Sequence, residues 1–319
     1  GGLKAEMVQR FLEQVITEKE PIREIRIRIG KPVFVLDSEG EKILNFDEKR
    51  GNPELLRIED EKENSGIENG SMADSELIRA LMEIFARHSL YAYEREISQG
   101  FLTICGGHRV GIAGKAVVED GHVRTVRDLS SLNIRVAHEV KGCAKNVLPY
   151  LMDGETFLDT LLISPPGAGK TTLLRDLIRE LSCGGTWGAG KNVSVVDERS
   201  EIAGCYDGKT SYDLGPRTDV LDGCPKADGI LMLIRAMSPD VVMTDEIGKP
   251  EDAAAIRSAL SAGVKIITTI HGSSFEDAAK SAVGSLITDH VFETLIFLSA
   301  QPVTGTVEKI LRMPEVSHG

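Results

Sequence analysis

The pattern of hydrophobic and polar positions is irregular in the first half of the chain and regular in the second. Apolar residues recur at helical spacing near the start, which predicts an amphipathic helix over residues 3–18. Isoleucines then alternate with arginines over residues 25–29, the period of a half-buried strand. A glycine- and proline-containing turn leads into a second predicted strand over residues 33–36.

The rest of the first half combines polar, helical and alternating segments. Residues 47–75 are acidic and glycine-spotted, which predicts a mobile loop within the first domain. A helix is predicted from about Asp74, with Leu77, Ile78, Leu81, Met82 and Phe85 on its buried face. Residues 100–127 consist of segments of alternating apolar and polar residues separated by glycines, which predicts a β-meander. Residues 129–147 are expected to form the passage between two domains.

After that passage, short apolar runs of strand length alternate with helical segments. This order is typical of a parallel α/β sheet. We therefore expect two domains, an N-terminal α/β domain over residues 1–145 and a second domain over residues 146–319.

Composition narrows the functional classes. The chain has 319 residues and a net charge of −12, which disfavours a general binder of nucleic-acid backbones. Its five cysteines contain no C-x-x-C pair, which indicates a reducing compartment. The sequence shows no apolar run of membrane-spanning length and no signal peptide at its start, so we expect a cytosolic protein.

A phosphate-binding loop is the clearest chemical motif. A short apolar run, Leu161–Ile163, leads into a glycine-containing segment and then into a helical pattern. The glycines let backbone N–H groups turn towards phosphate oxygens, Lys170 would reach the β- and γ-phosphates, and Thr171 would ligate Mg²⁺. Ser164 stands where the first glycine of this motif is expected, and serine is small enough for the loop to form. The predicted nucleotide-binding residues are Ser164, Pro165, Pro166, Gly167, Ala168, Gly169, Lys170, Thr171 and Thr172.

A second apolar strand ends in the pair Asp245 and Glu246. An aspartate at the tip of such a strand can hold Mg²⁺ through water, and the next glutamate can activate the water that attacks the γ-phosphate. A protein that only switches on bound nucleotide does not need this second carboxylate. The pair therefore favours hydrolysis over a passive switch.

Two further strands end in polar residues and leave alternatives open. Asp197 or Glu198 would assist water activation or order Mg²⁺, or would instead cap a helix and pair with Arg199. On the other strand, His271 or Thr269 would sense the γ-phosphate, unless the histidine is a satisfied buried residue. Ligands gather at the carboxyl edge of open parallel sheets, where both strands would end.

In their order along the chain, these four segments resemble the Walker A, Asp box, Walker B and His box of the secretion-ATPase superfamily. Its members are hexameric motors of type II and type IV secretion and of pilus assembly. The resemblance covers residues 155–275 and implies a RecA-like P-loop ATPase domain. It implies that Glu198 is the Asp-box acid, Glu246 the catalytic glutamate and His271 the His-box histidine. Asp245 replaces a glycine that is frequent in secretion motors and is more similar to the Asp-Glu pair of AAA+ ATPases.

Longer strings resemble the stage III sporulation protein AA family over nearly the whole chain. They include Tyr91–Glu94, Gly106–Gly111, Asp128–Arg135, Val196–Gly204 and Arg217–Gly223. The resemblance implies a cytosolic ATPase of endospore formers, active in the mother cell. It would work at the base of a trans-envelope channel complex, attached to the membrane through a membrane-protein partner.

A basic segment precedes the second domain. Residues 106–145 carry seven basic side chains against four acidic ones. A guanidinium can stabilise charge that develops on the γ-phosphoryl group. Secretion motors supply such arginines from the N-terminal domain, which makes Arg124, Arg127 and Arg135 the candidates. Arg217 or Arg235 could serve across a subunit boundary instead.

Competing functions rest on weaker signals. Gly111–Gly114 matches the GxxG of KH domains, which favours a single-stranded nucleic-acid-dependent ATPase, but only 5% of the residues are aromatic. A non-hydrolysing assembly scaffold is the other alternative. The combined prediction is a smaller α/β N-terminal domain followed by a RecA-like domain with a mostly parallel sheet. It would assemble as a homo-oligomeric ring, most simply a hexamer, and hydrolyse ATP with Mg²⁺.

Overall fold

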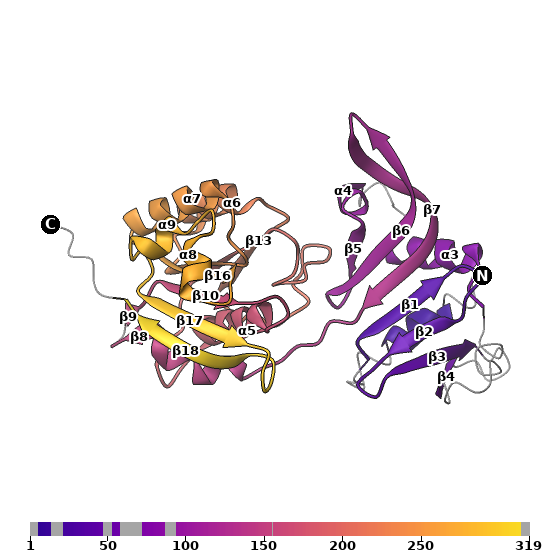
Figure 1. The fold of residues 1–319 in the computed structure, drawn as a ribbon, viewed down its shortest axis with the longest axis horizontal. Helices are drawn as coiled ribbons and strands as arrows, with labels where there is room; N and C mark the ends of the chain where they lie inside the picture. The colour runs from indigo at the N-terminus through magenta and orange to yellow at the C-terminus, as the bar shows by residue number, and fades with distance from the viewer. Residues whose placement is uncertain are drawn as a thin grey trace. The chain divides into compact units, whose positions relative to one another are not determined.

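The computed structural model describes residues 6–13, 22–46, 53–57, 72–86, 94–154 and 156–313. The chain forms two compact units, residues 1–138 and 139–319, each with its own sheet (Figure 1). Within the described ranges, no helix has both the length and the apolar character needed to cross a bilayer.

The first unit is built on an antiparallel sheet with the order β4-β3-β2-β1-β7-β6-β5. Its strands are β1 (Glu24–Arg28), β2 (Val33–Leu36), β3 (Glu41–Phe46), β4 (Pro53–Arg57), β5 (Phe101–Ile104), β6 (His108–Glu119) and β7 (His122–Arg135). The two strands predicted from alternation near residues 25 and 33 are confirmed as β1 and β2. The predicted meander is confirmed as β5, β6 and β7.

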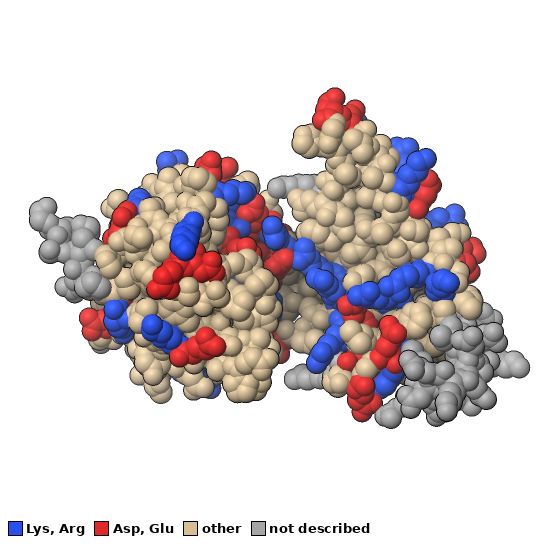
Figure 2. Space-filling model, in the orientation of Figure 1, with Lys and Arg blue, Asp and Glu red and all other residues tan. Residues whose placement is uncertain are grey.

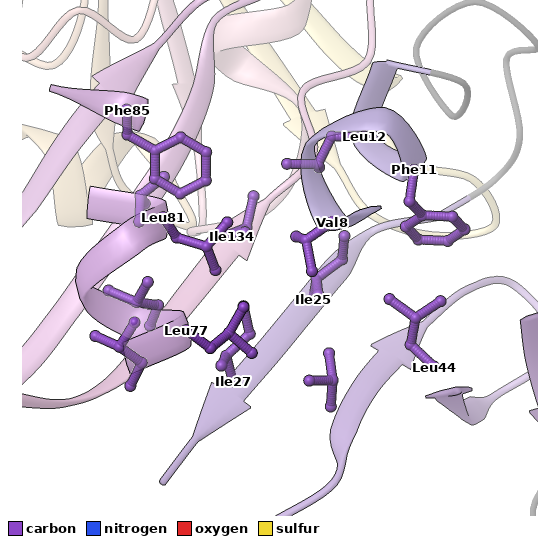
Figure 3. Packing of buried hydrophobic residues seen from close by; sticks show 14 of the residues in the cluster. Val8, Phe11, Leu12, Ile25, Ile27, Leu44, Leu77, Leu81, Phe85 and Ile134 are labelled. Carbon is purple, nitrogen blue, oxygen red and sulfur yellow. The ribbon is translucent and has the colours of Figure 1, made fainter. Parts of the chain in front are cut away.

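Helices cover one face of this sheet. They comprise a helix over 6–13 and α3 (Ser75–Phe85), while the short α4 (Glu94–Ser98) comes just before β5 in the chain. Asp74 caps α3 by accepting the N–H of Leu77 at 2.7 Å, and every residue predicted for the buried face of this helix is buried. Val8, Leu77 and Leu81 pack against Ile25 on β1 and Ile134 on β7 in one apolar core (Figure 3).

Three expectations for the first unit are corrected. The segment 47–75 is not loop throughout, because β4 pairs with β3 there and Leu55 packs on the core; residues 47–52 and 58–71 lie outside the described residues. Residues 129–135 are not a passage between domains, since they form the end of β7. The GxxG segment, 111–114, lies inside β6 as extended strand, so the KH-like interpretation is wrong. The outer parts of the expected helix over 3–18 lie outside the described residues.

The second unit contains a seven-stranded sheet with the order β14-β13-β15-β16-β10-β17-β18. The neighbouring strands are parallel except for β18, which pairs antiparallel with β17. Its strands are β10 (Thr160–Ser164), β13 (Val193–Asp197), β14 (Thr218–Asp222), β15 (Val241–Thr244), β16 (Lys265–His271), β17 (Thr294–Ser299) and β18 (Thr306–Arg312). The predicted parallel α/β sheet is confirmed.

Helices lie on both faces of this sheet. They are α5 (Lys170–Cys183), α6 (Lys226–Met237), α7 (Pro250–Ser261), α8 (Phe275–Ala279) and α9 (Ser285–Thr288). Helices α6 to α9 share one apolar core with the sheet, and α5 lies on the opposite side (Figure 1). Short elements precede or join these helices: η2 (Cys143–Asn146), η3 (Leu148–Leu151), β8 (Met152–Asp153), β9 (Thr156–Phe157), β11 (Gly184–Gly185) and β12 (Gly188–Ala189). Because β10, β13, β15 and β16 run parallel, their carboxyl ends meet at one edge of the sheet.

Candidate functional site

A buried strand, a loop with two glycines and a long helix follow one another in the second unit. All five residues of β10 are buried, and the 14-residue helix α5 begins at Lys170 with Gly169 as its N-cap. Gly167 and Gly169 have φ values of 74° and 86°, where any residue with a Cβ is strained. The loop therefore directs backbone N–H groups and the positive end of α5 towards one place, which suits an anion such as phosphate.

The other loop residues differ in exposure. Pro165 and Pro166 are exposed, while Thr171 and Thr172 are half-buried in the first turn of α5. Ala168 is buried, and its carbonyl accepts the N–H of Gly305, from the loop between β17 and β18, at 3.1 Å. This loop was not predicted to be near the site, because its sequence carries no phosphate-binding pattern.

The side chain of Lys170 is folded back onto the start of the loop. Its Nζ donates to the backbone carbonyl of Ser164 at 2.9 Å, to the Ser164 hydroxyl at 3.1 Å and to the carbonyl of Pro165 at 3.3 Å. The serine that replaces the first glycine of the motif thus binds the lysine directly. Burial lowers the pKa of Lys170, although the charge of Glu246 acts in the opposite direction.

A histidine joins Lys170 to the predicted catalytic glutamate. His271, at the end of β16, has its Nδ1 2.8 Å from Nζ of Lys170 and its Nε2 2.9 Å from a carboxylate oxygen of Glu246. An ammonium group can only donate, so Nδ1 accepts, and the neutral ring carries its proton on Nε2 and donates it to Glu246. His271 is not a satisfied buried histidine, since 41% of its side chain is exposed. The other candidate, Thr269, is buried, and its carbonyl accepts the N–H of Ile247.

Two further acids converge on a lysine that the sequence did not single out. Lys226, at the start of α6, lies 2.6 Å from Glu198 and 3.2 Å from Oδ1 of Asp245, and all but 7% of it is buried. Lys249 approaches Glu198 at 3.6 Å from the solvent side. Burial acts to raise the pKa of Glu198, but the two lysines outweigh it and the pKa is lowered. For Asp245, burial is the larger effect and its pKa is raised.

Asp197 has a structural role in the loop that follows β13. Its carboxylate is fully buried and accepts the backbone N–H groups of Glu201, Ile202 and Ala203 at 2.8–3.0 Å. Burial raises its pKa to about 7 against these donors. Arg175 binds the carbonyls of Glu201 and Ile202 from α5, so the same loop is fixed from both sides. Of the two acids proposed for the site, Glu198 is the one that forms an ion pair with Lys226 among the described residues.

The residues proposed for Mg²⁺ fit a site completed by a nucleotide. Among the described residues, no cluster of three or more His, Cys, Asp or Glu side chains could hold a metal alone. Mg²⁺ characteristically takes only one or two protein carboxylates and draws its other ligands from phosphate and water. Asp245 is a buried carboxylate that already has a cation, the Lys226 ammonium, beside it. Thr171 offers a hydroxyl in the first turn of the helix after the loop.

The arginine candidates belong to other parts of the structure. Arg124, Arg127 and Arg135 are exposed residues of β7 in the first unit, and Arg124 pairs with Glu119 at 2.5 Å. In the second unit, Arg217 donates to the carbonyl of Ser182, while Arg235 is exposed on α6. A role for any of them towards phosphate stays a prediction.

Comparison with known proteins places these features in a family. The model of the family described as sporulation stage III, protein AA, matches residues 2–314. The stage III sporulation protein AA of Bacillus subtilis (strain 168) is 41% identical over 290 residues, which cover 91% of this chain and 86% of that protein.

Two solved structures share the fold. The ATPase DotB of Legionella pneumophila matches with a TM-score of 0.53 at 17% sequence identity. The match covers 91% of this chain and 75% of the DotB chain. The pilus retraction motor PilT matches with a TM-score of 0.59 at 13% sequence identity, over 96% of this chain and 83% of the PilT chain. At these identities the likeness establishes the fold, which is the RecA-like architecture of secretion ATPases with a smaller α/β domain in front.

Proposed function

The chain belongs to the stage III sporulation protein AA family, and we propose that it is a Mg²⁺-dependent ATPase motor of a trans-envelope sporulation complex. The observation that carries the proposal is the side-chain connection from Lys170 through His271 to Glu246. It joins the predicted phosphate-binding lysine to the predicted catalytic base across three separate segments of the chain. One solved fold neighbour, the pilus retraction motor PilT, was crystallised with bound ADP, which agrees with nucleotide use by this architecture.

In the proposed reaction, the loop N–H groups and Lys170 bind the β- and γ-phosphates of ATP. Lys170 then exchanges its contact with His271 for phosphate oxygens, while His271 keeps its hydrogen bond to Glu246. Glu246 accepts a proton from water as the water oxygen bonds to the γ-phosphorus. The bond between that phosphorus and the β–γ bridging oxygen breaks, and ADP and phosphate are released.

Thr171 and Asp245 would hold Mg²⁺, which neutralises charge on the phosphates when bound. Glu198 and Lys226 keep the Asp245 carboxylate in a fixed, charge-compensated position. Arginines from a neighbouring subunit or from the first unit would offset the charge that develops on the γ-phosphoryl group. The candidates are Arg124, Arg127, Arg135, Arg217 and Arg235.

The family resemblance supports a proposal for the assembly and location of the motor. We propose a homo-oligomeric ring, most simply a hexamer, in the cytoplasm of the mother cell, held at the membrane by a membrane-protein component of the complex. A strictly monomeric mass at high concentration with an ATP analogue and Mg²⁺ would contradict the ring. A pull-down from membranes with ATP-trapped protein tests for the membrane partner.

Replacing Glu246 by Gln tests hydrolysis. The variant keeps the volume and one hydrogen-bond acceptor but loses the base, so phosphate release is expected to fall by about 10²–10⁴-fold while ATP binding persists. Glu251→Gln is the matched control, because Glu251 is an exposed acid in the first turn of α7. Unchanged turnover in Glu246→Gln refutes the assignment of the base. Nucleotide binding without phosphate release in the unmodified protein favours the non-hydrolysing scaffold.

A further inference from the structure

The sheet of the first unit presents arginines on the face opposite its apolar core. On β1, Ile25 and Ile27 point into the core, so Arg26 and Arg28 point to the other side. In the same way, β7 directs Ile134 into the core and Asn133 outwards. Figure 2 shows a band of basic side chains across the part of this unit that contains β1, β6 and β7.

A cavity of about 170 Å³ lies on this outward face. Strand register explains the hollow, since Arg26 is paired with Asn133 and Asn133 with Gly111, which has no side chain. One row further along, Arg28 is paired with Ser131 and Ser131 with Ala113. Each row therefore has a long basic side chain on β1 at one end and a very small residue on β6 at the other. The cavity lining comprises Arg26, Arg28, Gly111, Ile112, Ala113, Ser131, Leu132 and Asn133.

The charge in and around the cavity is unbalanced. No acidic residue lines it, and Arg28 forms no ion pair with any residue in the described part of the chain, whereas Arg26 pairs with Glu24. In the adjacent row, Arg135 on β7 lies between Glu24 on β1 and Arg109 on β6.

An unsatisfied acceptor adds to this arrangement. The side-chain oxygen of Asn133 is buried and accepts no hydrogen bond from the described residues. A buried polar atom without a partner is costly unless a ligand or water supplies one. A group that enters the cavity is favoured if it brings a negative charge for the guanidinium groups.

We propose that this cavity, lined by Arg26, Arg28 and Asn133, binds an acidic side chain of an extended peptide segment in a partner protein. A glutamate or aspartate side chain brings such a negative charge, as a carboxylate, to the two guanidinium groups. The cavity is smaller than the 300–1,000 Å³ of ordinary small-molecule pockets, which suits one side chain and not a nucleotide. No aromatic residue lines it, which disfavours stacking of nucleic-acid bases. The site lies in the first unit and does not depend on the proposed ATPase reaction.

Binding of a defined peptide to the full chain tests the proposal. The probe is a fluorescein-labelled, acetylated hexapeptide with four glutamates, and the comparison peptide carries glutamines at the same positions. Arg28→Gln is expected to weaken binding about tenfold, the loss of one charge-assisted contact. Arg79→Gln is the charge-matched control, since Arg79 is exposed on α3, on the covered side of the sheet.

A second variant separates the cavity from general electrostatic attraction. Gly111→Val fills the hollow without changing charge, and a Cβ at this position meets Asn133 only at an ordinary 3.7 Å. Valine also suits a strand, so the fold is expected to persist. Loss of the glutamate peptide in both Arg28→Gln and Gly111→Val, with retention in Arg79→Gln, supports the site. Unchanged binding in Gly111→Val, equal loss in Arg79→Gln or equal binding of the glutamine peptide overturns it. Displacement of the peptide by a single-stranded oligonucleotide, with loss in the same variants, assigns the site to nucleic acid instead.

Discussion

Replacing Lys226 by Met tests how the second unit holds its two strand-end acids. The ammonium of Lys226 lies 2.6 Å from Glu198 and 3.2 Å from Asp245, and Lys226 and Asp245 are only 7% and 6% exposed. Methionine has a similar length and keeps the packing, but it leaves the Asp245 carboxylate buried without its cation. Breaking a buried pair in this way costs about 3–5 kcal/mol of unfolding free energy. We therefore expect a loss of about 3 kcal/mol at pH 7.5.

Lys249→Met is the matched control. It also removes a lysine beside Glu198, but this pair is 3.6 Å apart and the Lys249 side chain is 67% exposed. Exposed ion pairs contribute less than about 1 kcal/mol to stability, so the control should lose only a few tenths of a kcal/mol of unfolding free energy. Urea unfolding, followed by circular dichroism with and without each change, measures both values.

The deficit in unfolding free energy of Lys226→Met, relative to the unmodified protein, should also depend on pH. Burial raises the pKa of Asp245, and removal of Lys226 takes away the effect that opposes the rise. A carboxyl group whose pKa is raised by folding stabilises the fold while it is protonated and loses that contribution as pH rises through the folded pKa. The deficit should therefore narrow as pH falls. Adding Asp245→Asn to Lys226→Met should restore at least half of the loss, because no buried charge is then left alone. Equal losses in Lys226→Met and Lys249→Met refute the reasoning.

Two further changes test other parts of the structure. His108 is buried, which lowers its pKa from 6.5 to about 4, so the unfolded chain binds more protons and stability falls as pH drops from 6.5 towards 4. At 1.36 kcal/mol per pKa unit, the loss of unfolding free energy should reach about 3 kcal/mol. His108→Gln should remove most of this pH dependence, which urea unfolding at pH 7 and pH 4.5 measures. An unchanged pH dependence in the variant would contradict the attribution to His108. Gly169→Ala imposes a Cβ at φ 86° and 3.1 Å from Cγ2 of Thr304, so it should weaken binding of a fluorescent ATP analogue about tenfold. Gly111→Ala, where the Cβ has ordinary contacts, is the control, and equal affinity in both variants argues against the strain.

Periodicity sufficed for most elements of the first unit. The isoleucine alternation of β1 and the apolar face of α3 follow from local spacing, and both elements form with the predicted residues buried. β4 was missed because its acidic surroundings hide a five-residue strand that is stabilised by pairing with β3. The end of β7 was missed for a similar reason, since Leu132 and Ile134 pair with β1, which lies about a hundred residues earlier. Strand pairing between distant segments leaves little local signal.

The sequence by itself determined the strand, glycine loop and helix over residues 160–183, the family, and the acids at the strand ends. Each of these depends on residues that are neighbours in the chain, so residue type and spacing are enough to reveal them. Only the tertiary structure decided which acids meet which cations. The sequence around Lys226 carries no motif, so it does not indicate that the Lys226 ammonium pairs with both Glu198 and Asp245. His271 likewise contacts both Lys170 and Glu246 because parallel strands bring their carboxyl ends to one edge. Hydrogen bonds and ion pairs act over a few ångströms, and the fold sets those distances between segments far apart in the chain.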